Sequence, residues 1–170
     1  MFDPIHLHPM IVHFPIALLV VGCISDLAGA VFKRIFFSKA GFYLLLLGTL
    51  GVIAAYFSGN FAGEGLAEGG ALKQALERHE GAAVLSLRLM TATSVVRILM
   101  VASKKFTGAI RWIPVLMFLV SVLSIARTGY YGGELVFRHA AGVQLSIDES
   151  LGNTVDPSPV EKNPVADKDQ

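Results

Sequence analysis

The chain has 170 residues, of which 54% are hydrophobic and 16% are charged, and its formal net charge is +1. A soluble domain of this length cannot bury so much apolar surface, so the composition indicates a membrane protein. The near-neutral charge excludes the broad basic surface that a nucleic-acid-binding protein needs. The single cysteine, Cys23, cannot form an intramolecular disulfide, and we expect it to fill space within a helix.

The first apolar run, Pro9 to Phe32, is long enough to cross the hydrocarbon layer, which takes about 20 residues. No basic segment precedes it and no small-residue cleavage site follows it, so we expect a retained helix and not a signal peptide. Pro9 suits the first helical turn, where the missing N–H costs nothing. Pro15 removes one backbone hydrogen bond and is expected to bend the helix.

Three further apolar runs predict three further membrane helices, at Ala40–Phe57, Gly81–Ala102 and Ile110–Tyr131. The second contains small residues at helical spacing, which favour close packing against a neighbouring helix: Gly48, Gly51 and Ala55. The third contains several hydroxyl and arginine side chains, so we expect it to lie inside a bundle and not against lipid. The sequence therefore predicts an all-α fold, a four-helix transmembrane bundle.

After the fourth run, Gly132 and Gly133 are expected to interrupt the helix before a short segment that contains His139. From about residue 150 the chain is polar and contains several prolines, a composition typical of disorder. We therefore predict a membrane domain over residues 1–149 and a disordered polar tail over residues 150–170.

The distribution of basic residues predicts the orientation of the bundle, because short cytoplasmic loops are enriched in lysine and arginine. The first and third connections are basic, with Lys33, Arg34, Lys39, Lys104, Lys105 and Arg111. The second connection is mainly acidic. We therefore expect a multi-pass protein of the bacterial inner membrane, with both termini and residues 58–80 in the periplasm.

Histidines are expected to gather at the periplasmic face of this bundle. His6, His8 and His13 lie at the start of the first helix, His79 lies near the start of the third, and His139 follows the fourth. A histidine at a membrane interface can simply exploit its apolar ring and polar tip. The convergence of the set nevertheless favours a bound cofactor or metal, and His6, in the lead-in segment, is the weakest candidate.

Imidazole binds zinc, copper, nickel and iron, so the residue type alone does not identify the metal. The sequence has no HExxH or CxxC motif of the kind that zinc sites often use. Histidines on different helices of a bundle are instead typical of haem ligation. We expect His13, His79 and His139, and next His8, to supply the ligands of one or two b-type haems, with copper or zinc as the alternative.

Charged residues within membrane segments are costly and usually functional. Asp26 and Arg97 lie at similar depth, and we expect them to form a structural ion pair. Arg127 lies nearer the periplasmic surface, where it can meet Glu64, Glu134 or an anionic cofactor group such as a haem propionate. Arg88 is unexplained, because it points away from the face of His79 and no intramembrane carboxylate lies at its level.

Three short motifs carry a family resemblance: HLHPMIVHFPIALL in the first helix, HEGAA in the third and GYYGGELVFRHAAGV after the fourth. Together they resemble a bacterial family of four-helix membrane proteins, domain of unknown function 2231, over roughly residues 6–145. Relatives are often associated with Rieske iron–sulfur or cytochrome c modules, which implies a redox context. His8, His13, His79 and His139 match the motifs. Ala140 and Ala141 depart from them, since relatives often place a glycine there.

Together these observations predict that the protein is a membrane-bound haem electron-transfer subunit rather than a stand-alone enzyme. Its expected partners are membrane lipid and redox subunits such as cytochrome c or Rieske proteins, with quinol as a further candidate and no nucleic acid. The alternatives are a copper- or zinc-binding membrane protein and a structural anchor for a larger complex.

Overall fold

The computed structural model of the chain describes residues 4–63 and 70–141, and the side chains of residues 8–63 and 70–141. It contains four helices in these ranges: α1 (Pro4–Phe32), α2 (Ile35–Gly63), α3 (Gly70–Ala102) and α4 (Trp112–His139). Each is long and apolar enough to cross a membrane. The all-α, four-helix prediction is therefore confirmed. The expected domain boundary at residue 149 and the polar tail lie outside the described residues.

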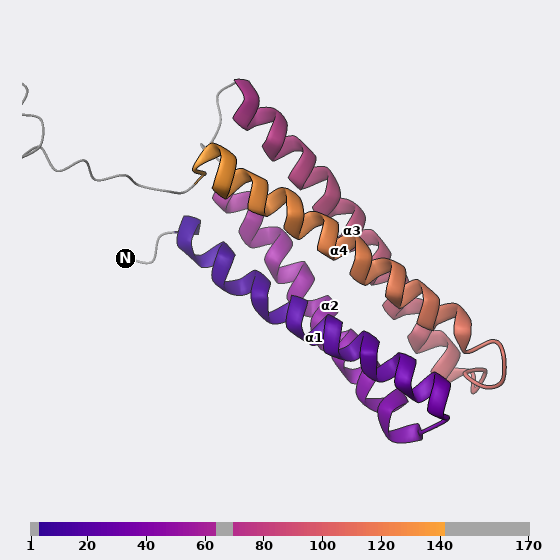
Figure 1. Cartoon of the computed structure of the whole chain (residues 1–170). Coiled ribbons are helices and arrows are strands. Elements are labelled where there is room, and N and C mark those ends of the chain that lie inside the picture. Colours follow the sequence, from indigo (N-terminus) through magenta and orange to yellow (C-terminus); the bar gives the residue numbers. More distant parts are fainter. Residues whose placement is uncertain (1–3, 64–69, 142–170) are drawn as a thin grey trace, which may run out of the picture.

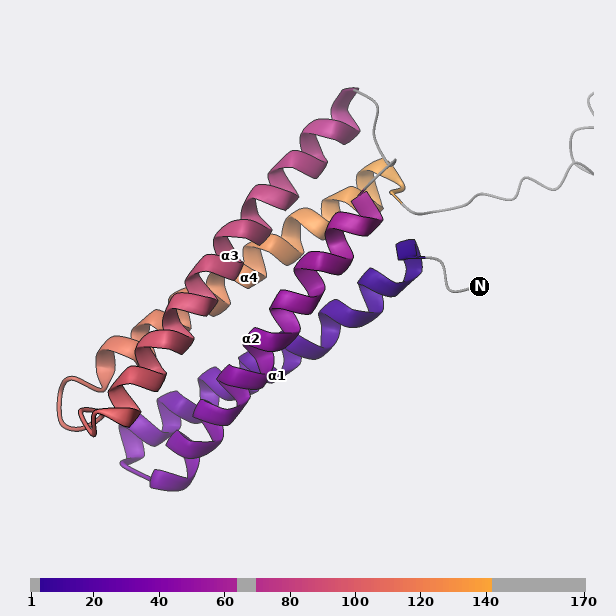
Figure 2. The same ribbon diagram turned by 180° about the vertical axis from the view of Figure 1, so that it is seen from behind.

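The helices form an elongated antiparallel bundle built from two hairpins (Figures 1 and 2). The most extensive packing lies between α1 and α2 and between α3 and α4, while α2–α3 and α1–α4 contacts are sparser. The start of α1, the end of α2, the start of α3 and the end of α4 lie together. We call this the histidine end, because it contains His8, His79 and His139. The opposite end, with the α1–α2 and α3–α4 connections, is the ion-pair end.

All four helices are longer than the apolar runs that predict them. The additional turns include polar residues, which pair their backbone groups within a helix as well as apolar ones do. The expected interruption at Gly132–Gly133 is wrong, because α4 continues through both glycines to His139. Glycine lowers helix propensity by only about 1 kcal/mol, which packing against neighbouring helices can offset. Pro9 likewise lies inside α1 and not in its first turn.

Glycines of α2 allow its backbone to approach α1 closely. A Cβ atom added to Gly41 would lie 2.8 Å from the backbone nitrogen of Asp26, and one added to Gly51 would lie 2.8 Å from Cβ of Pro15. A Cβ atom at Gly48 would meet the side chain of Leu19. The expected close packing through Gly48 and Gly51 is thus present, since van der Waals contact between helices holds membrane bundles together.

Hydroxyl groups hold α3 inside the bundle. Ser86 contacts the hydroxyls of Ser124 at 2.8 Å and Thr128 at 2.9 Å, and Thr93 contacts Ser121 at 2.9 Å. Ser94 reaches the other hairpin, where its hydroxyl lies 2.7 Å from that of Thr49. Such hydrogen bonds between helices satisfy polar groups that lipid cannot. These hydroxyl side chains face the interior as expected, whereas Arg88 and Thr91 of the same helix are exposed on the outside of the bundle.

An apolar cluster completes the core between the two hairpins. It consists of Leu19, Cys23, Leu45, Met90 and Phe118. Cys23 is buried and unbonded, as expected for a space-filling residue. Many large apolar side chains remain exposed on the outside of the bundle, as expected for a protein whose solvent is lipid.

Candidate functional site

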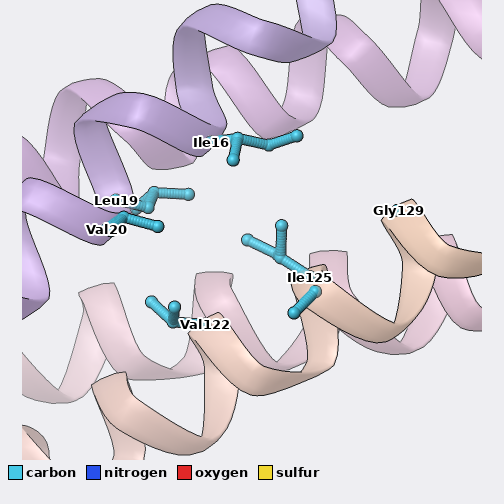
Figure 3. A pocket seen from close by; sticks show the side chains of 7 residues that line it. Ile16, Leu19, Val20, Val122, Ile125 and Gly129 are labelled. Atoms are coloured by element: carbon cyan, nitrogen blue, oxygen red, sulfur yellow. The ribbon is translucent and has the colours of Figure 1, made fainter.

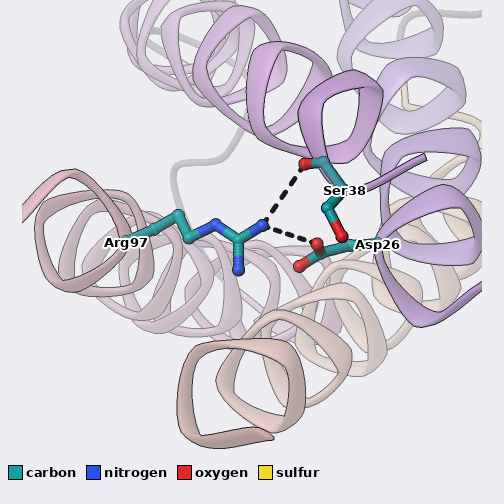
Figure 4. A network of polar contacts seen from close by, with 3 residues as sticks. All are labelled: Asp26, Ser38 and Arg97. Atoms are coloured by element: carbon teal, nitrogen blue, oxygen red, sulfur yellow. Dashed lines mark hydrogen bonds and ion pairs between the residues drawn. The ribbon is translucent and has the colours of Figure 1, made fainter. Parts of the chain in front are cut away.

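A buried ion pair joins α1 to α3 at the ion-pair end (Figure 4). Nη2 of Arg97 donates to Oδ1 of Asp26 at 2.7 Å, and both side chains are almost completely buried. The same nitrogen donates to the carbonyl of Ser38 at 3.3 Å. The ring of Phe106 stacks on the guanidinium group, with 3.3 Å between Cζ of Arg97 and the ring centroid. The predicted pairing of Asp26 with Arg97 is confirmed.

The ion pair fixes the register between α1 and α3, which run in the same direction. His8 precedes Asp26 by eighteen residues, and His79 precedes Arg97 by the same number. Eighteen residues make five full turns and rise ~27 Å. His8 therefore lies on the α1 face of Asp26, and His79 lies on the α3 face of Arg97. Both imidazoles are directed into the bundle at the histidine end, at the same depth.

The imidazole of His79 is fixed by α4. Its Nδ1 lies 3.1 Å from the carbonyl oxygen of Thr128. A carbonyl oxygen can only accept, so Nδ1 must carry the hydrogen, and in the neutral ring Nε2 keeps its lone pair. The ring lies against Gly132, where an added Cβ atom would be 3.1 Å from Cε1 of His79. Glycine at this position therefore makes room for the half-buried ring.

The imidazole of His8 is fixed by α2 in the same manner. Its Nδ1 lies 2.9 Å from Oγ of Ser58, and that hydroxyl donates its hydrogen to the carbonyl of Ala55 at 2.9 Å. Because the hydroxyl hydrogen is already used, Ser58 accepts and Nδ1 of His8 donates. Nε2 of His8 keeps its lone pair. A Cβ atom added to Gly59 would be 3.0 Å from Cε1 of this ring.

Two imidazoles from opposite hairpins thus share one tautomer and one arrangement. Each donates from Nδ1 to an oxygen of its own hairpin, each rests on a glycine, and each keeps a free Nε2 lone pair. Metal-bound histidines characteristically donate their second nitrogen to such an oxygen, which fixes the ring and makes it more basic. His8 and His79 are therefore the pair best arranged to bind a metal or a haem iron.

The other histidines take different positions. His13 lies five residues after His8 on α1, on an exposed face, and donates from Nδ1 to the carbonyl of Pro9. His139 is half-buried in the last turn of α4. It lies seven residues beyond Gly132, on the same face and ~10.5 Å farther along the helix. The structure thus does not group His13 and His139 with His8 and His79, and their role as ligands stays a prediction. The side chain of His6 lies outside the described residues.

Arg127 lies on α4 near the histidine end but is directed along its own helix. Its Nη2 donates to the hydroxyl of Tyr131 at 3.3 Å, and its Cζ lies 5.3 Å from the centroid of that ring. Glu134, one of its expected partners, pairs instead with Arg138 at 2.9 Å. Glu64 lies outside the described residues. Arg127 is exposed, so its guanidinium group remains accessible to an anionic group.

Sequence reasoning missed the residues that hold the two imidazoles: Ser58, Gly59, Thr128 and Gly132. Gly132 belongs to the GYYGGEL motif, whose glycine pair predicts a helix interruption and so draws attention away from a role in packing. Ser58 and Gly59 lie just past the end of the predicted second span. The useful signal was the eighteen-residue spacing, which places a histidine and a charged residue on one face in each of two helices.

A hollow of about 170 Å³ lies between α1 and α4, near the middle of both helices (Figure 3). Its lining is apolar and consists of Ile16, Leu19, Val20, Val122, Ile125, Ala126 and Gly129. An apolar cavity of roughly 150 Å³ is enough to hold benzene. The hollow between α1 and α4 is open to the outside of the bundle, because Ile16, Val20 and Gly129 are exposed, and its size suits a ring or a short stretch of hydrocarbon chain. Gly129 adjoins Thr128, whose carbonyl fixes His79.

Comparison with known proteins assigns the family and leaves the activity open. No curated protein and no solved structure matches the chain significantly. The family described as "Predicted membrane protein (DUF2231)" matches residues 4–145, which include all four helices and both inward-facing histidines. The match covers most of the chain and agrees with four helices able to span a membrane. The chain is therefore a membrane protein that belongs to the DUF2231 family.

Proposed function

We propose that this protein is a b-type haem electron-transfer subunit of the membrane, with His8 and His79 as axial ligands. The observation that carries the proposal is the matched arrangement of these two imidazoles, which come from opposite hairpins and leave both Nε2 lone pairs free. Haem in helical bundles is bound in this way, between side chains of facing helices. The glycines beneath the rings fit this role, since they let bulky groups approach the helix backbones.

The donor set favours haem over a bare metal ion. A porphyrin supplies four nitrogens of its own, so two imidazoles complete the coordination of its iron. Zinc takes three or four protein ligands, and copper sites commonly combine histidine with further donors. Among the described side chains, those of residues 8–63 and 70–141, no group of three or more His, Cys, Asp or Glu is placed to hold a metal ion. Copper or zinc remains the alternative, and the spectroscopic experiment below distinguishes it from haem.

Bound haem would supply one-electron chemistry, and the residues of this chain would hold and tune it. The Thr128 carbonyl and the Ser58 hydroxyl orient the imidazoles and raise their basicity through the Nδ1 hydrogen bonds. The partial burial of both rings limits their contact with water. Arg127, exposed near the same end, is a candidate partner for a propionate group.

The charge distribution supports a periplasmic location for this site, and hence an electron partner in that compartment. Cytochrome c and Rieske proteins are the partner classes that we propose. For the membrane side we propose quinol, whose ring or isoprenoid tail matches the apolar hollow between α1 and α4 in size and character. Inner-membrane localisation follows from the same orientation.

Spectroscopy of purified protein tests the proposal. The wild type is expected to show a Soret band and a low-spin reduced-minus-oxidised difference spectrum. Replacing His8 or His79 with alanine should remove that signal or convert it to high spin, because each change opens one axial position. His13→Ala is the matched control on α1, since its ring is exposed and five residues away from His8.

Each other result has a defined meaning. If His13→Ala and His139→Ala also lose haem, a second haem is present. The pair of His8 and His79 is then not the whole of the haem-binding site. A colourless wild type that contains stoichiometric copper or zinc would replace haem with the metal alternative. If the wild type is both colourless and metal-free after haem and metal supplementation, the cofactor proposal is wrong. The remaining function is then that of a structural anchor for a larger complex.

A further inference from the structure

Arg88 of α3 lies at the middle of the bundle and points away from it. It is nine residues from His79 and nine from Arg97, so it is ~13.5 Å from each along the helix axis. Nine residues make two and a half turns, which place Arg88 on the face directly opposite these two inward-facing residues. The side chain is accordingly exposed on the outer surface of the bundle.

This position is unfavourable for a charged group in lipid. A charge near the bilayer centre is costly, and intramembrane arginines normally pair with a carboxylate or line a polar interior. Arg88 lies ~27 Å from the start of α3 at Gly70 and ~21 Å from its end at Ala102, which is farther than one arginine side chain can reach. Within residues 4–63 and 70–141 Arg88 has no ion-pair partner.

The chain does not offer a carboxylate at this depth in its described part. Asp26 is buried against Arg97, and Glu134 pairs with Arg138. Glu80, on the same helix, is eight residues or ~12 Å closer to the histidine end. A second copy of the chain in the same orientation, docked through this face about a two-fold axis, would place one Arg88 at the depth of the other. Like charges would then repel, so self-association is disfavoured here.

The surface around Arg88 has the form of a helix-packing face. Exposed residues follow one another at spacings of four and three along α3: Gly81, Leu85, Arg88, Ala92, Val95 and Leu99. Leu85, Val95 and Leu99 are 42%, 48% and 62% exposed. A Cβ atom added to Gly81 would meet open space. Ala92 follows Arg88 in this row and Gly81 precedes Leu85, and such small residues allow close approach of another helix, while Leu85, Val95 and Leu99 offer apolar contacts.

We propose that this face of α3 binds a transmembrane helix of a different protein, and that an aspartate or glutamate in the middle of that helix pairs with Arg88. The surface is opposite the histidine face of α3, so the proposal does not depend on haem binding. It assigns to the protein a lateral partner within the membrane.

Designed transmembrane peptides test this proposal directly. The full-length protein, labelled with a donor dye, is placed in lipid vesicles with acceptor-labelled peptides that have a leucine-rich span. One peptide carries a single glutamate at its centre, a second carries leucine there, and a third carries the glutamate near one end. Energy transfer then reports association. The central glutamate is expected to tighten binding about tenfold over leucine, as for hydrogen bonds between membrane helices of 1–2 kcal/mol.

Variants of the protein test whether Arg88 causes the tighter binding of the peptide with the central glutamate. Arg88→Leu should abolish the gain from the central glutamate, Arg88→Lys should keep most of it, and Arg78→Gln, which removes an exposed charge near the histidine end, should keep all of it. Because Arg88 is exposed, Arg88→Leu is expected to fold normally, and its circular dichroism spectrum checks this.

Three outcomes would overturn the proposal. Arg88 serves lipid phosphate instead if the central glutamate gives no gain over leucine in the wild type. If the peptide with the glutamate near one end binds equally well, binding does not require a carboxylate at the depth of Arg88. The face is a homodimer interface if energy transfer between two labelled copies of the chain is lost in Arg88→Leu.

Discussion

Ala140 has a backbone conformation that alanine rarely adopts. It follows the last residue of α4 with φ 49° and ψ 31°, in the left-handed region. Its N–H donates to the carbonyl of Val136, and that of Ala141 donates to Leu135, which closes the end of the helix. This geometry favours glycine, because a Cβ atom crowds the following carbonyl group. The glycine expected here in relatives thus has a backbone explanation that needs no close approach of a cofactor.

Replacing Ala140 with glycine is therefore expected to stabilise the protein. The change removes a steric cost of about 1 kcal/mol, so the free energy of unfolding should rise by about that amount. Unfolding by denaturing detergent, followed by circular dichroism, measures it. Ala141→Gly is the matched control at the next residue and should give no gain. Equal effects at both positions would show that the left-handed backbone of Ala140 is not strained.

Gly132 provides a second prediction for a single residue. Gly132→Val would push a side chain into the ring of His79, which lies 3.1 Å from where a Cβ atom would be. Displacing this ring from the Thr128 carbonyl should weaken binding of the proposed haem or metal about tenfold or more, as for other changes around metal-bound histidines. Haem content and metal content per protein measure the effect. Gly133→Val is the control, because its Cβ position is 4.0 Å from its nearest neighbour, Phe137.

The Asp26–Arg97 pair should contribute far more to stability than the exposed pair on α4. Removing one partner of a buried pair leaves an uncompensated charge, so Arg97→Leu should lower the free energy of unfolding by about 3–5 kcal/mol. Arg138→Ala breaks the pair with Glu134, in which Arg138 is 69% exposed, and should cost less than about 1 kcal/mol. The double variant Asp26→Leu/Arg97→Leu should recover much of the loss. A single variant as stable as the wild type would contradict this account.

At the scale of the helices, the contact between α1 and α2 depends on glycines that cannot be enlarged. A side chain at Gly41 would meet the backbone of Asp26, which cannot move aside as a flexible side chain could. Gly41→Val is expected to separate the helices and to lower the free energy of unfolding by about 1–3 kcal/mol. Gly81→Val on α3 meets open space and should have little effect. Comparable losses in the two variants would show that this helix contact is not tightly packed.

The helices themselves were largely predictable, because each apolar run must bury its backbone hydrogen bonds in a helix. Their ends were not. Hydropathy stops where polar residues begin, but the helices continue, as in the segment from Gly70 to Glu80 of α3 and from Gly132 to His139 of α4. Glycine pairs predict a break from local propensity alone, whereas contact with a neighbouring helix decides the outcome.

The site was predictable in part. The sequence places the histidines at one end and pairs Asp26 with Arg97. It does not tell whether His8 or His13 points inward, because that depends on which face of α1 meets its neighbours. His8 and His13 differ by five residues and so by about 140° around α1. Only the packing of Pro15, Leu19 and Asp26 against α2 shows that the face of His8 is the inner one.

At the scale of the whole molecule, the two ends of the bundle differ in both chemistry and charge. The ion-pair end has the basic connections, with Lys33, Arg34, Lys104, Lys105 and Arg111. The histidine end includes acidic residues such as Glu77, Glu80 and Glu134. Because the hairpins place both basic connections at one end, the orientation of the molecule determines on which side of the membrane the histidines lie.

The positive-inside tendency predicts that the ion-pair end is cytoplasmic and the histidine end periplasmic. Fusions to alkaline phosphatase, which is active only in the periplasm, test this at Ala71 and at Lys104. Activity is expected at Ala71 and not at Lys104, and cytoplasmic reporter fusions should give the reverse pattern. Moving the basic residues of the first connection to the second should weaken this preference. Alkaline phosphatase that is active when fused at Lys104 and inactive when fused at Ala71 would reverse the orientation. The imidazoles would then lie at the cytoplasmic surface, where neither of the proposed partners, cytochrome c and a Rieske domain, could reach them.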